Sequence, residues 1–180
     1  MPQHPVPSQR GMVHVYTGDG KGKTTAALGL ALRAVGRGFR VAIVQFLKAQ
    51  PSGERAASER LHPDLVIHAV GRPGMVDPAH LQPEDTAAAK AGLDLARNLL
   101  RSGEYQLVVL DEVCVSTAWG LLAVDEVVEL VKSRPPGVEI VLTGRQADER
   151  LLALADYVTE MRSVKHPFER GVAAREGIEW

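Results

Sequence analysis

Short apolar runs alternate with helix-like segments along this chain, and this alternation restricts the possible folds more than any other feature. The apolar runs cover residues 12–16, 40–46, 65–70, 106–110, 138–142 and 157–161, and the helix-like segments cover residues 24–35, 83–102, 124–132 and 147–155. Runs that are apolar at almost every position are typical of parallel strands buried on both faces. The sequence therefore predicts a doubly wound α/β fold, with a mainly parallel sheet and helices on both faces.

Two stretches between these elements lack helix or strand signals. Residues 48–63 are mostly polar, and residues 71–83 contain three prolines and two glycines. We expect both stretches to be long loops, which in small domains are often functional.

The chain length of 180 residues favours one domain. Residues 1–10 contain three prolines and no apolar periodicity, so we expect a flexible N-terminal arm. Residues 11–180 show no internal repeat and no linker, and we expect them to form a single domain.

Composition excludes several classes of protein. Lys and Arg number 21 against 22 Asp and Glu, so the basic excess typical of nucleic-acid binding is missing. The one cysteine, Cys114, cannot form an intrachain disulfide or a cysteine-built zinc site. No apolar stretch approaches the roughly 18 residues of a membrane span, and the first 20 residues do not resemble a signal peptide. We therefore expect a cytoplasmic protein with no membrane and no nucleic-acid partner.

The strongest local motif is the glycine-rich stretch Gly18–Thr24, GDGKGKT, between the first predicted strand and the first predicted helix. Glycines allow backbone N–H groups to surround phosphate oxygens, and a helix N-terminus adds partial positive charge. Lys23 can reach the outer phosphates, and the Thr24 hydroxyl can bind Mg²⁺. Thr17 stands where the common P-loop pattern has its first glycine. The alternative is a glycine-rich turn without a ligand.

A second motif, Leu107–Glu112, is an apolar run that ends in two carboxylates, Asp111 and Glu112. Acidic groups at the carboxyl edge of a parallel sheet lie beside a phosphate-binding loop, where one of them can bind Mg²⁺ directly or through water. The alternative is a pair of solvated acids that end a strand.

Two further stretches are open to more than one interpretation. Arg145 follows a predicted strand at the same edge of the sheet, and can face a ligand or be a solvated loop charge. Residues 165–175, which are rich in cations, follow the last predicted strand, and on physical grounds alone they indicate a frayed tail.

Taken together, these segments resemble the ATP:corrinoid adenosyltransferases of vitamin B12 synthesis. The resemblance rests on GDGKGKTTAALGLALRA (18–34), VAIVQFLK (41–48), LVVLDE (107–112), LTGR (142–145), ADYVTEM (155–161) and KHPFERGVAAREGIEW (165–180). It extends over nearly the whole chain after residue 11 and includes the shortened loop with Thr17. It implies a P-loop NTPase architecture of the RecA-like type.

The resemblance also implies a reaction and a set of site residues. Family members transfer the 5′-deoxyadenosyl group of ATP to the cobalt(I) of a reduced corrinoid and release triphosphate. The implied catalytic residues are Lys23 and Glu112, and the implied Mg²⁺ ligands are Thr24, Glu112 and Asp111. The residues implied to bind ATP are Gly18, Asp19, Gly20, Lys21, Gly22, Lys23, Thr24, Thr25 and Arg145. The residues implied to contact the corrinoid are Met75, Lys165, His166, Phe168 and Arg175.

The sequence departs from many relatives after the third predicted strand. Those relatives carry a Gly-Phe-Thr-Trp-like segment, whose aromatic residues displace the lower axial ligand of cobalt. Residues 71–77 contain no aromatic residue here. Either Met75 serves as the apolar wedge, or the axial ligand is displaced in another way.

The family further implies a homodimer and a reductase or reduced flavin as electron donor. Other interpretations of the motifs are a small P-loop nucleoside kinase, another P-loop NTPase, or a nucleotide-binding regulator without catalytic activity. The absence of paired cysteines counts against the zinc-bearing kinases of similar fold.

Overall fold

The computed structural model describes residues 10–74 and 76–178, and its strands form one parallel sheet. The strands are β1 (Val13–Thr17), β2 (Val41–Phe46), β3 (Leu65–Val70), β4 (Leu107–Asp111), β5 (Glu139–Thr143) and β6 (Tyr157–Glu160). They lie in the order β3-β2-β4-β5-β1-β6, and every neighbouring pair is parallel. The predicted doubly wound α/β fold is confirmed, and the arrangement is consistent with a P-loop NTPase-like fold.

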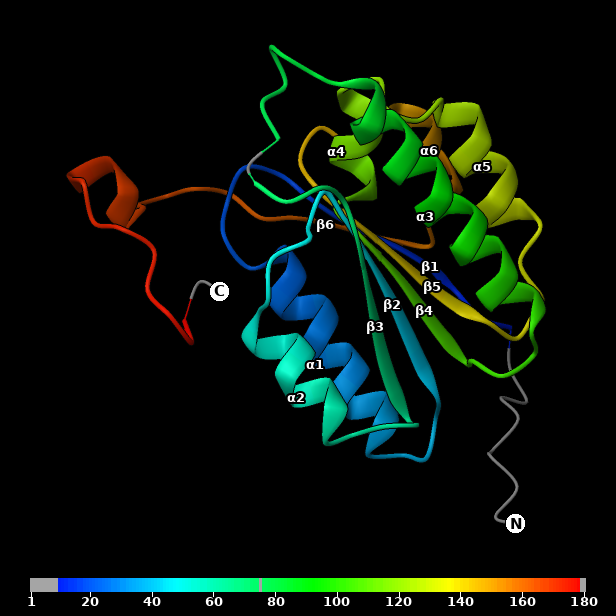
Figure 1. Cartoon of the computed structure of the whole chain (residues 1–180). Helices are drawn as coiled ribbons and strands as arrows, with labels where there is room; N and C mark the ends of the chain where they lie inside the picture. The colour runs from blue at the N-terminus through cyan, green and yellow to red at the C-terminus, as the bar shows by residue number, and fades with distance from the viewer. Residues whose placement is uncertain (1–9, 75, 179–180) are drawn as a thin grey trace.

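Helices cover both faces of the sheet (Figure 1). On one face lie α1 (Lys23–Val35) and α2 (Gly53–Glu59). On the other face lie α3 (Pro83–Arg101), α4 (Val113–Ala118), α5 (Val124–Lys132) and α6 (Glu149–Leu154). The chain passes from one helical layer to the other between β3 and β4, as a doubly wound fold requires.

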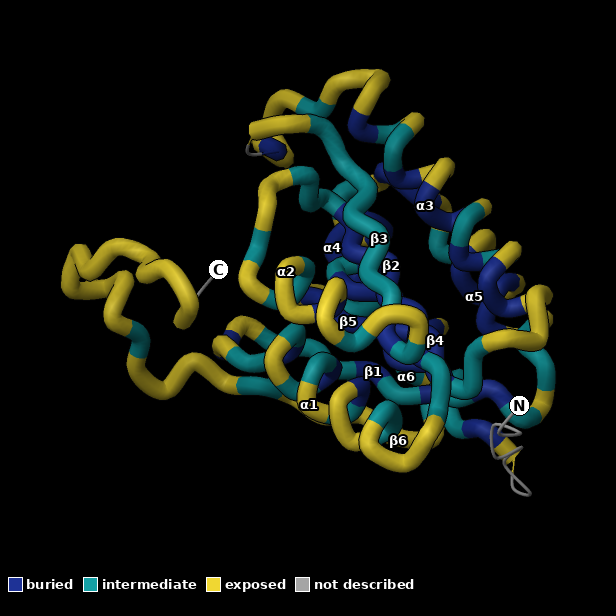
Figure 2. The backbone as a smooth tube through the Cα atoms, turned by 60° about the horizontal axis from the view of Figure 1, so that its bottom comes forward, coloured by how far each residue is buried: buried dark blue, intermediate teal, exposed yellow. Residues whose placement is uncertain are grey.

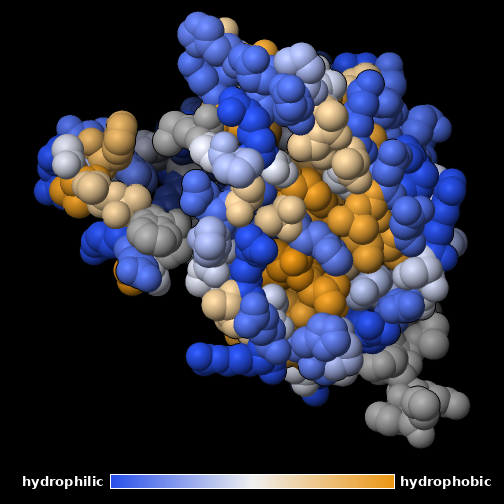
Figure 3. Space-filling view, in the orientation of Figure 1, coloured by the Kyte–Doolittle hydropathy of each residue, from blue (hydrophilic) through white to orange (hydrophobic). Residues whose placement is uncertain are grey.

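The apolar character of the strands follows from this two-sided cover. In β4, Leu107 and Val109 pack in the core beneath α1, while Val108 and Leu110 pack in the core beneath α3 to α6. Side chains of a strand alternate between the two faces of a sheet, so a strand covered on both faces is apolar at every position. The edge strand β3 is only half buried beyond Leu65, and Figure 3 shows apolar side chains gathered there, between α2 and α3.

The structure corrects one of the expected loops. Residues 53–59, within the stretch 48–63 expected to be a loop, form α2. Its sequence GERAASE contains two alanines and no larger apolar residue, so it carries no amphipathic pattern that periodicity could detect.

Two other short helices were not expected. The helix α4 begins directly after the strand-end carboxylates without a side-chain cap, and the 3₁₀ helix η1 covers Pro167–Arg170. Neither is long enough to show helical periodicity.

After β6 the chain leaves the sheet. Residues 162–178, which we call the C-terminal arm, are exposed at every position except His166, which is partly buried, and extend away from the helical layers (Figure 2). None of the helices in the described part of the chain has the length and apolar content needed to cross a membrane.

Candidate active site

The glycine-rich loop and the strand-end carboxylates meet at the carboxyl edge of the sheet. A cavity of about 260 Å³ is lined there by Asp19, Gly20, Lys21, Gly22, Lys23, Thr24, Thr25, Glu112, Arg145 and His166. We call this the phosphate cavity. Of the residues expected to bind ATP, only Gly18 is not in this lining, and the fold brings Arg145 to the glycine-rich loop from a distant segment of the chain.

The loop requires glycine for two physical reasons. Gly20 lies against the segment that follows β6, where a β-carbon would be only 2.7 Å from the backbone carbonyl carbon of Arg162. Its N–H donates to the Met161 carbonyl at 2.6 Å, which fixes this close approach. Gly22 has φ of +122°, a conformation that other residues rarely adopt. The loop is therefore held in shape by the chain after β6 as well as by α1.

Lys23, the first residue of α1, places its ammonium within the curve of the loop. Its Nζ donates to the carbonyl oxygens of Gly18 at 2.6 Å and Gly20 at 2.8 Å, and only 7% of the residue is exposed. Burial lowers the pKa of this amine, while the nearby Glu112 carboxylate opposes that shift. The loop carbonyls thus hold a partly desolvated cation at the cavity where phosphate oxygens would bind.

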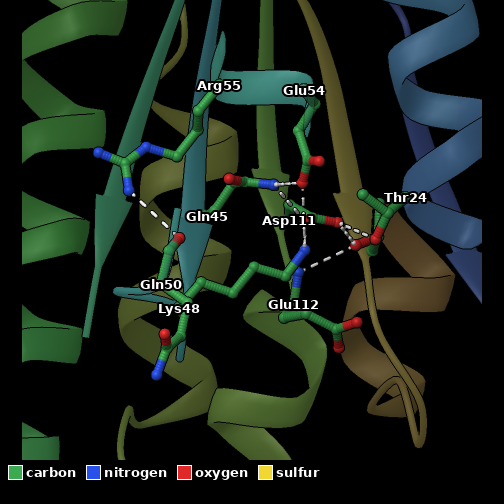
Figure 4. Close-up of polar contacts among 9 residues, drawn as sticks. Thr24, Gln45, Lys48, Gln50, Glu54, Arg55, Asp111 and Glu112 are labelled. Atoms are coloured by element: carbon green, nitrogen blue, oxygen red, sulfur yellow. Dashed lines mark hydrogen bonds and ion pairs between the residues drawn. The ribbon is translucent and has the colours of Figure 1, made fainter. Parts of the chain in front are cut away.

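Asp111 is 1% exposed and accepts hydrogen bonds from four side chains. Its Oδ1 accepts from the hydroxyls of Thr24 at 2.8 Å and Thr143 at 2.7 Å. Its Oδ2 accepts from Lys48 Nζ at 3.0 Å and Gln45 Nε2 at 3.3 Å. Figure 4 shows the labelled partners converging on it. Four bonds use the full acceptor capacity of a carboxylate, so Asp111 organises its neighbours.

Glu112 behaves differently from its neighbour in sequence. Its backbone is left-handed, with φ of 63° and ψ of 17°, and its carboxylate points away from Asp111 (Figure 4). Burial and then the charge of Asp111 raise the pKa of the Glu112 carboxyl, and the cations Lys48, Lys23 and Arg145 partly offset this. Of the two acids, Glu112 is the one that lines the phosphate cavity.

The site fits a divalent cation held jointly with phosphate. Thr24 and Glu112 line the same cavity, and the Thr24 hydroxyl donates its proton to Asp111, which leaves its lone pairs available. Mg²⁺ takes few protein oxygens and completes its shell with water and phosphate. Within the described residues, no group of three or more His, Cys, Asp or Glu side chains could hold a metal ion alone.

A second cavity adjoins the phosphate cavity and shares Asp19, Glu112 and Arg145 with it. Its volume is about 460 Å³, and its other lining residues are Phe46, Leu47, Lys48, Val115, Trp119 and Gln146. We call it the side cavity. Its wall combines two aromatic rings and aliphatic groups with two cations, so it suits a ligand with both apolar and polar parts.

The residues expected on the corrinoid side are only partly brought to these cavities. His166 lines the phosphate cavity. Phe168 and Arg175 line, with His166, a separate pocket of about 80 Å³ within the C-terminal arm, and Lys165 is exposed on the same arm. Met75 lies outside the described residues.

Sequence reasoning missed Gln45 and Lys48 as partners of Asp111, and in the stretch Thr143–Arg145 it assigned a role only to Arg145. Gln45 and Thr143 are fully buried, and each is a polar residue at or near the end of a mostly apolar strand. That pattern was a usable signal, because a buried polar side chain needs partners and strand ends of a parallel sheet meet at one edge.

Comparison with known proteins identifies the family of this chain. The model of the family "ATP:corrinoid adenosyltransferase BtuR/CobO/CobP" matches residues 9–180. The corrinoid adenosyltransferase of Escherichia coli K12 is 40% identical over 96% of this chain and 87% of its own length. The corrinoid adenosyltransferase CobA of Salmonella typhimurium LT2 is also 40% identical, with the same coverage. A corrinoid adenosyltransferase of Pseudomonas aeruginosa PAO1 is 38% identical over 96% of this chain and 85% of its own length. Matches of this extent, on a fold that places a glycine-rich loop beside strand-end carboxylates, show that the chain belongs to the ATP:corrinoid adenosyltransferase family of transferases.

Proposed function

We propose that this chain transfers the 5′-deoxyadenosyl group of ATP to the cobalt(I) of a reduced corrinoid, in the biosynthesis or salvage of adenosylcobalamin. The family match across residues 9–180 is the observation that carries this proposal. The phosphate cavity supports it, because a loop of backbone N–H groups with Lys21 and Lys23 suits a triphosphate.

The reaction needs positioning and charge neutralisation. Cobalt(I) supplies both electrons of the new cobalt–carbon bond. The bond between C5′ and its oxygen breaks, and triphosphate leaves with the electron pair of this broken bond. No water is activated, so no hydrolytic base is required. The Lys23 ammonium and the loop N–H groups would stabilise the charge that develops on the leaving oxygen.

We assign Mg²⁺ to Thr24 and Glu112, together with phosphate oxygens and water. When bound there, Mg²⁺ neutralises part of the triphosphate charge. Asp111 orients the Thr24 hydroxyl through the 2.8 Å hydrogen bond, and Arg145 adds a further cation to the lining of the cavity.

The corrinoid would occupy the side cavity and the space between it and the C-terminal arm. Trp119 and Leu47 offer an apolar wall in that cavity, and His166 connects the arm to the phosphate cavity. Contacts from Lys165, Phe168 and Arg175 would then require the arm to close over the substrate. The role of Met75 as an apolar wedge stays a prediction.

We further propose that residues 11–180 act as a single domain, that the chain forms a homodimer, and that a reductase or reduced flavin supplies the electrons. The cytoplasmic location expected from the sequence stays a prediction.

The proposed function is tested by anaerobic incubation with ATP, Mg²⁺ and chemically reduced cobalamin. We expect a light-sensitive adenosylated corrinoid, recognised by its absorption spectrum before and after illumination. ADP formation that depends on an added nucleoside, with no change in the corrinoid, would instead support the nucleoside kinase.

A further inference from the structure

Strand β5 lies between the two strands that carry the phosphate site. The glycine-rich loop follows β1 and the acidic pair ends β4, and β5 pairs with both strands. Thr143 is the last residue of β5 and is fully buried, in register with Tyr16 of β1. It therefore occupies the position through which the two halves of the site can be joined.

The Thr143 hydroxyl makes two hydrogen bonds toward the acidic pair. It accepts from the backbone N–H of Glu112 at 2.9 Å and donates to Asp111 Oδ1 at 2.7 Å. The same Oδ1 accepts from the Thr24 hydroxyl at 2.8 Å. One hydroxyl thus contacts Glu112 directly and Thr24 through a single carboxylate oxygen.

The bond to the Glu112 N–H falls where the backbone is strained. Glu112 has a left-handed backbone, which places the β-carbon of an L-residue close to its own carbonyl and persists only where surrounding contacts enforce it. This conformation turns the chain from β4 into α4 and directs the Glu112 carboxylate into the phosphate cavity.

We propose that Thr143 is a positioning residue for the Mg²⁺–ATP site, a role that rests on the assignment of Thr24 and Glu112 as Mg²⁺ ligands. Its hydroxyl holds the backbone of Glu112 in the conformation that directs the Glu112 carboxylate into the phosphate cavity. The same hydroxyl and the Thr24 hydroxyl both donate to Asp111 Oδ1, so the positions of Thr24 and Glu112 are fixed relative to each other. Loss of the hydroxyl loosens Glu112 and removes one of the four donors to Asp111. Thr143 does not line the phosphate cavity, so its removal leaves the contacts of the loop with phosphate in place.

The test measures ATP binding by calorimetry, in Mg²⁺ and in EDTA, with no corrinoid present. Thr143→Val removes the hydroxyl at nearly constant volume, Thr143→Ala removes it while leaving space to relax, and Thr143→Ser keeps it. Thr117→Val is the matched control, since Thr117 is also a buried threonine but donates to the Cys114 carbonyl within α4. The quantity compared is the factor by which Mg²⁺ tightens ATP binding.

We expect Thr143→Val and Thr143→Ala to reduce this factor by about tenfold, the loss typical of one hydrogen bond to a charged group, with ATP affinity in EDTA unchanged. Thr143→Ser and Thr117→Val should keep the wild-type factor. If only one of Thr143→Val and Thr143→Ala folds, that variant alone is sufficient for the test. An unchanged factor, an equal loss of affinity in Mg²⁺ and EDTA, or a wild-type protein whose ATP affinity ignores Mg²⁺ would overturn the proposal. The binding assay contains no corrinoid, so its result does not depend on adenosyl transfer. A failure of adenosyl transfer in the separate turnover assay would contradict the proposed function without changing the interpretation of the binding data.

Discussion

Lys23, Asp111 and Glu112 are ionisable residues that the fold takes largely out of water, and each is stabilised differently. Lys23 is held by loop carbonyls, Asp111 by four donors, and Glu112 by the more distant charges of Lys23, Lys48 and Arg145. A buried charge is tolerated when hydrogen bonds replace its hydration. By that criterion Asp111 is the structural member of the group, and Glu112 is the one kept available for a ligand.

Replacing Lys23 with alanine should slow adenosyl transfer by about 100-fold or more, as expected when one preorganised donor to a developing negative charge is lost. The fold should survive, because the side-chain hydrogen bonds of Lys23 end on loop carbonyls. Turnover at saturating ATP is the measurement, and Lys90→Ala, at an exposed position of α3, is the control. A folded Lys23→Ala protein with near-normal turnover would remove Lys23 from the mechanism.

Glu112→Gln should stabilise the ligand-free protein at neutral pH. Burial raises the pKa of this carboxyl above its unfolded value, so its ionisation favours the unfolded state. The folded state therefore favours the protonated carboxyl. The stability gained from this preference is fully present below the unfolded pKa, near 4.5, and is lost as the pH rises through the folded pKa. The advantage of glutamine in urea unfolding should therefore grow with rising pH and then level off. Glu59→Gln, at an exposed position of α2, is the control, and a constant or negative difference would contradict the interpretation.

Asp111→Asn should have the opposite effect on stability. Asparagine would present an amide donor to a site that already contains four donors, at a cost of about 3 kcal/mol for a broken buried charge network. Urea unfolding measures this loss, and the Mg²⁺ requirement of turnover separates the two acids. If Glu112→Gln left that requirement unchanged while Asp111→Asn raised it sharply, the roles assigned to the two acids would have to be exchanged.

At the level of single residues, the sequence predicted the glycine-rich loop better than the residues that hydrogen-bond to Asp111. Lys23 and Thr24 stand in one contiguous motif, so their neighbours in space are also their neighbours in sequence. Gln45, Lys48 and Thr143 meet Asp111 only after three strands pair, at separations of 32 to 66 residues. A polar residue near the end of an apolar strand indicates that it needs a partner, but it does not identify that partner.

At the level of elements, periodicity predicted the strands and long helices because each buries a continuous apolar surface. The repeat of Ala88, Ala91, Leu95 and Leu99 correctly predicted the helix α3 but not its buried face. The buried face contains Leu93, Ala96 and Leu100, and of the four predicted residues only Leu99 is buried. The short helices α2, α4 and η1 were missed, since four to seven residues are too few to show helical periodicity. The C-terminal arm was predicted to contact the corrinoid only through the family resemblance, because no residue in it packs in the two cores of the sheet.

Ending the chain after Ser163 should leave the thermal midpoint unchanged. Residues 164–178, the described part of the removed segment, include no member of either core, and the Gly20 contact with Met161 and Arg162 is kept. Adenosyl transfer should fall by more than about tenfold, because loss of positioning contacts slows a reaction between bound substrates. Calorimetry and a turnover assay measure the two effects. Normal turnover by the shortened chain would show that His166 and the rest of the arm take no part.

At the level of the whole molecule, uniformly apolar strands between helices predicted a parallel sheet but not the order of its strands. The position of β5 between β1 and β4 depends on which crossovers pack best, and each strand alone is compatible with several places in the sheet. That order nevertheless decides the site, because it separates the glycine-rich loop from the acidic pair by the width of one strand. The gap is filled by Thr143, which bonds to both acids.

The central claim is that the chain directs an attack at C5′ of ATP and so expels all three phosphates together. Phosphorus NMR of a completed anaerobic reaction with ATP, Mg²⁺ and cob(I)alamin tests this most directly. We predict one inorganic triphosphate for each adenosylated corrinoid formed, with no accumulation of ADP or AMP. Release of ADP with phosphate, or of AMP with diphosphate, in step with the change in the corrinoid would contradict the account.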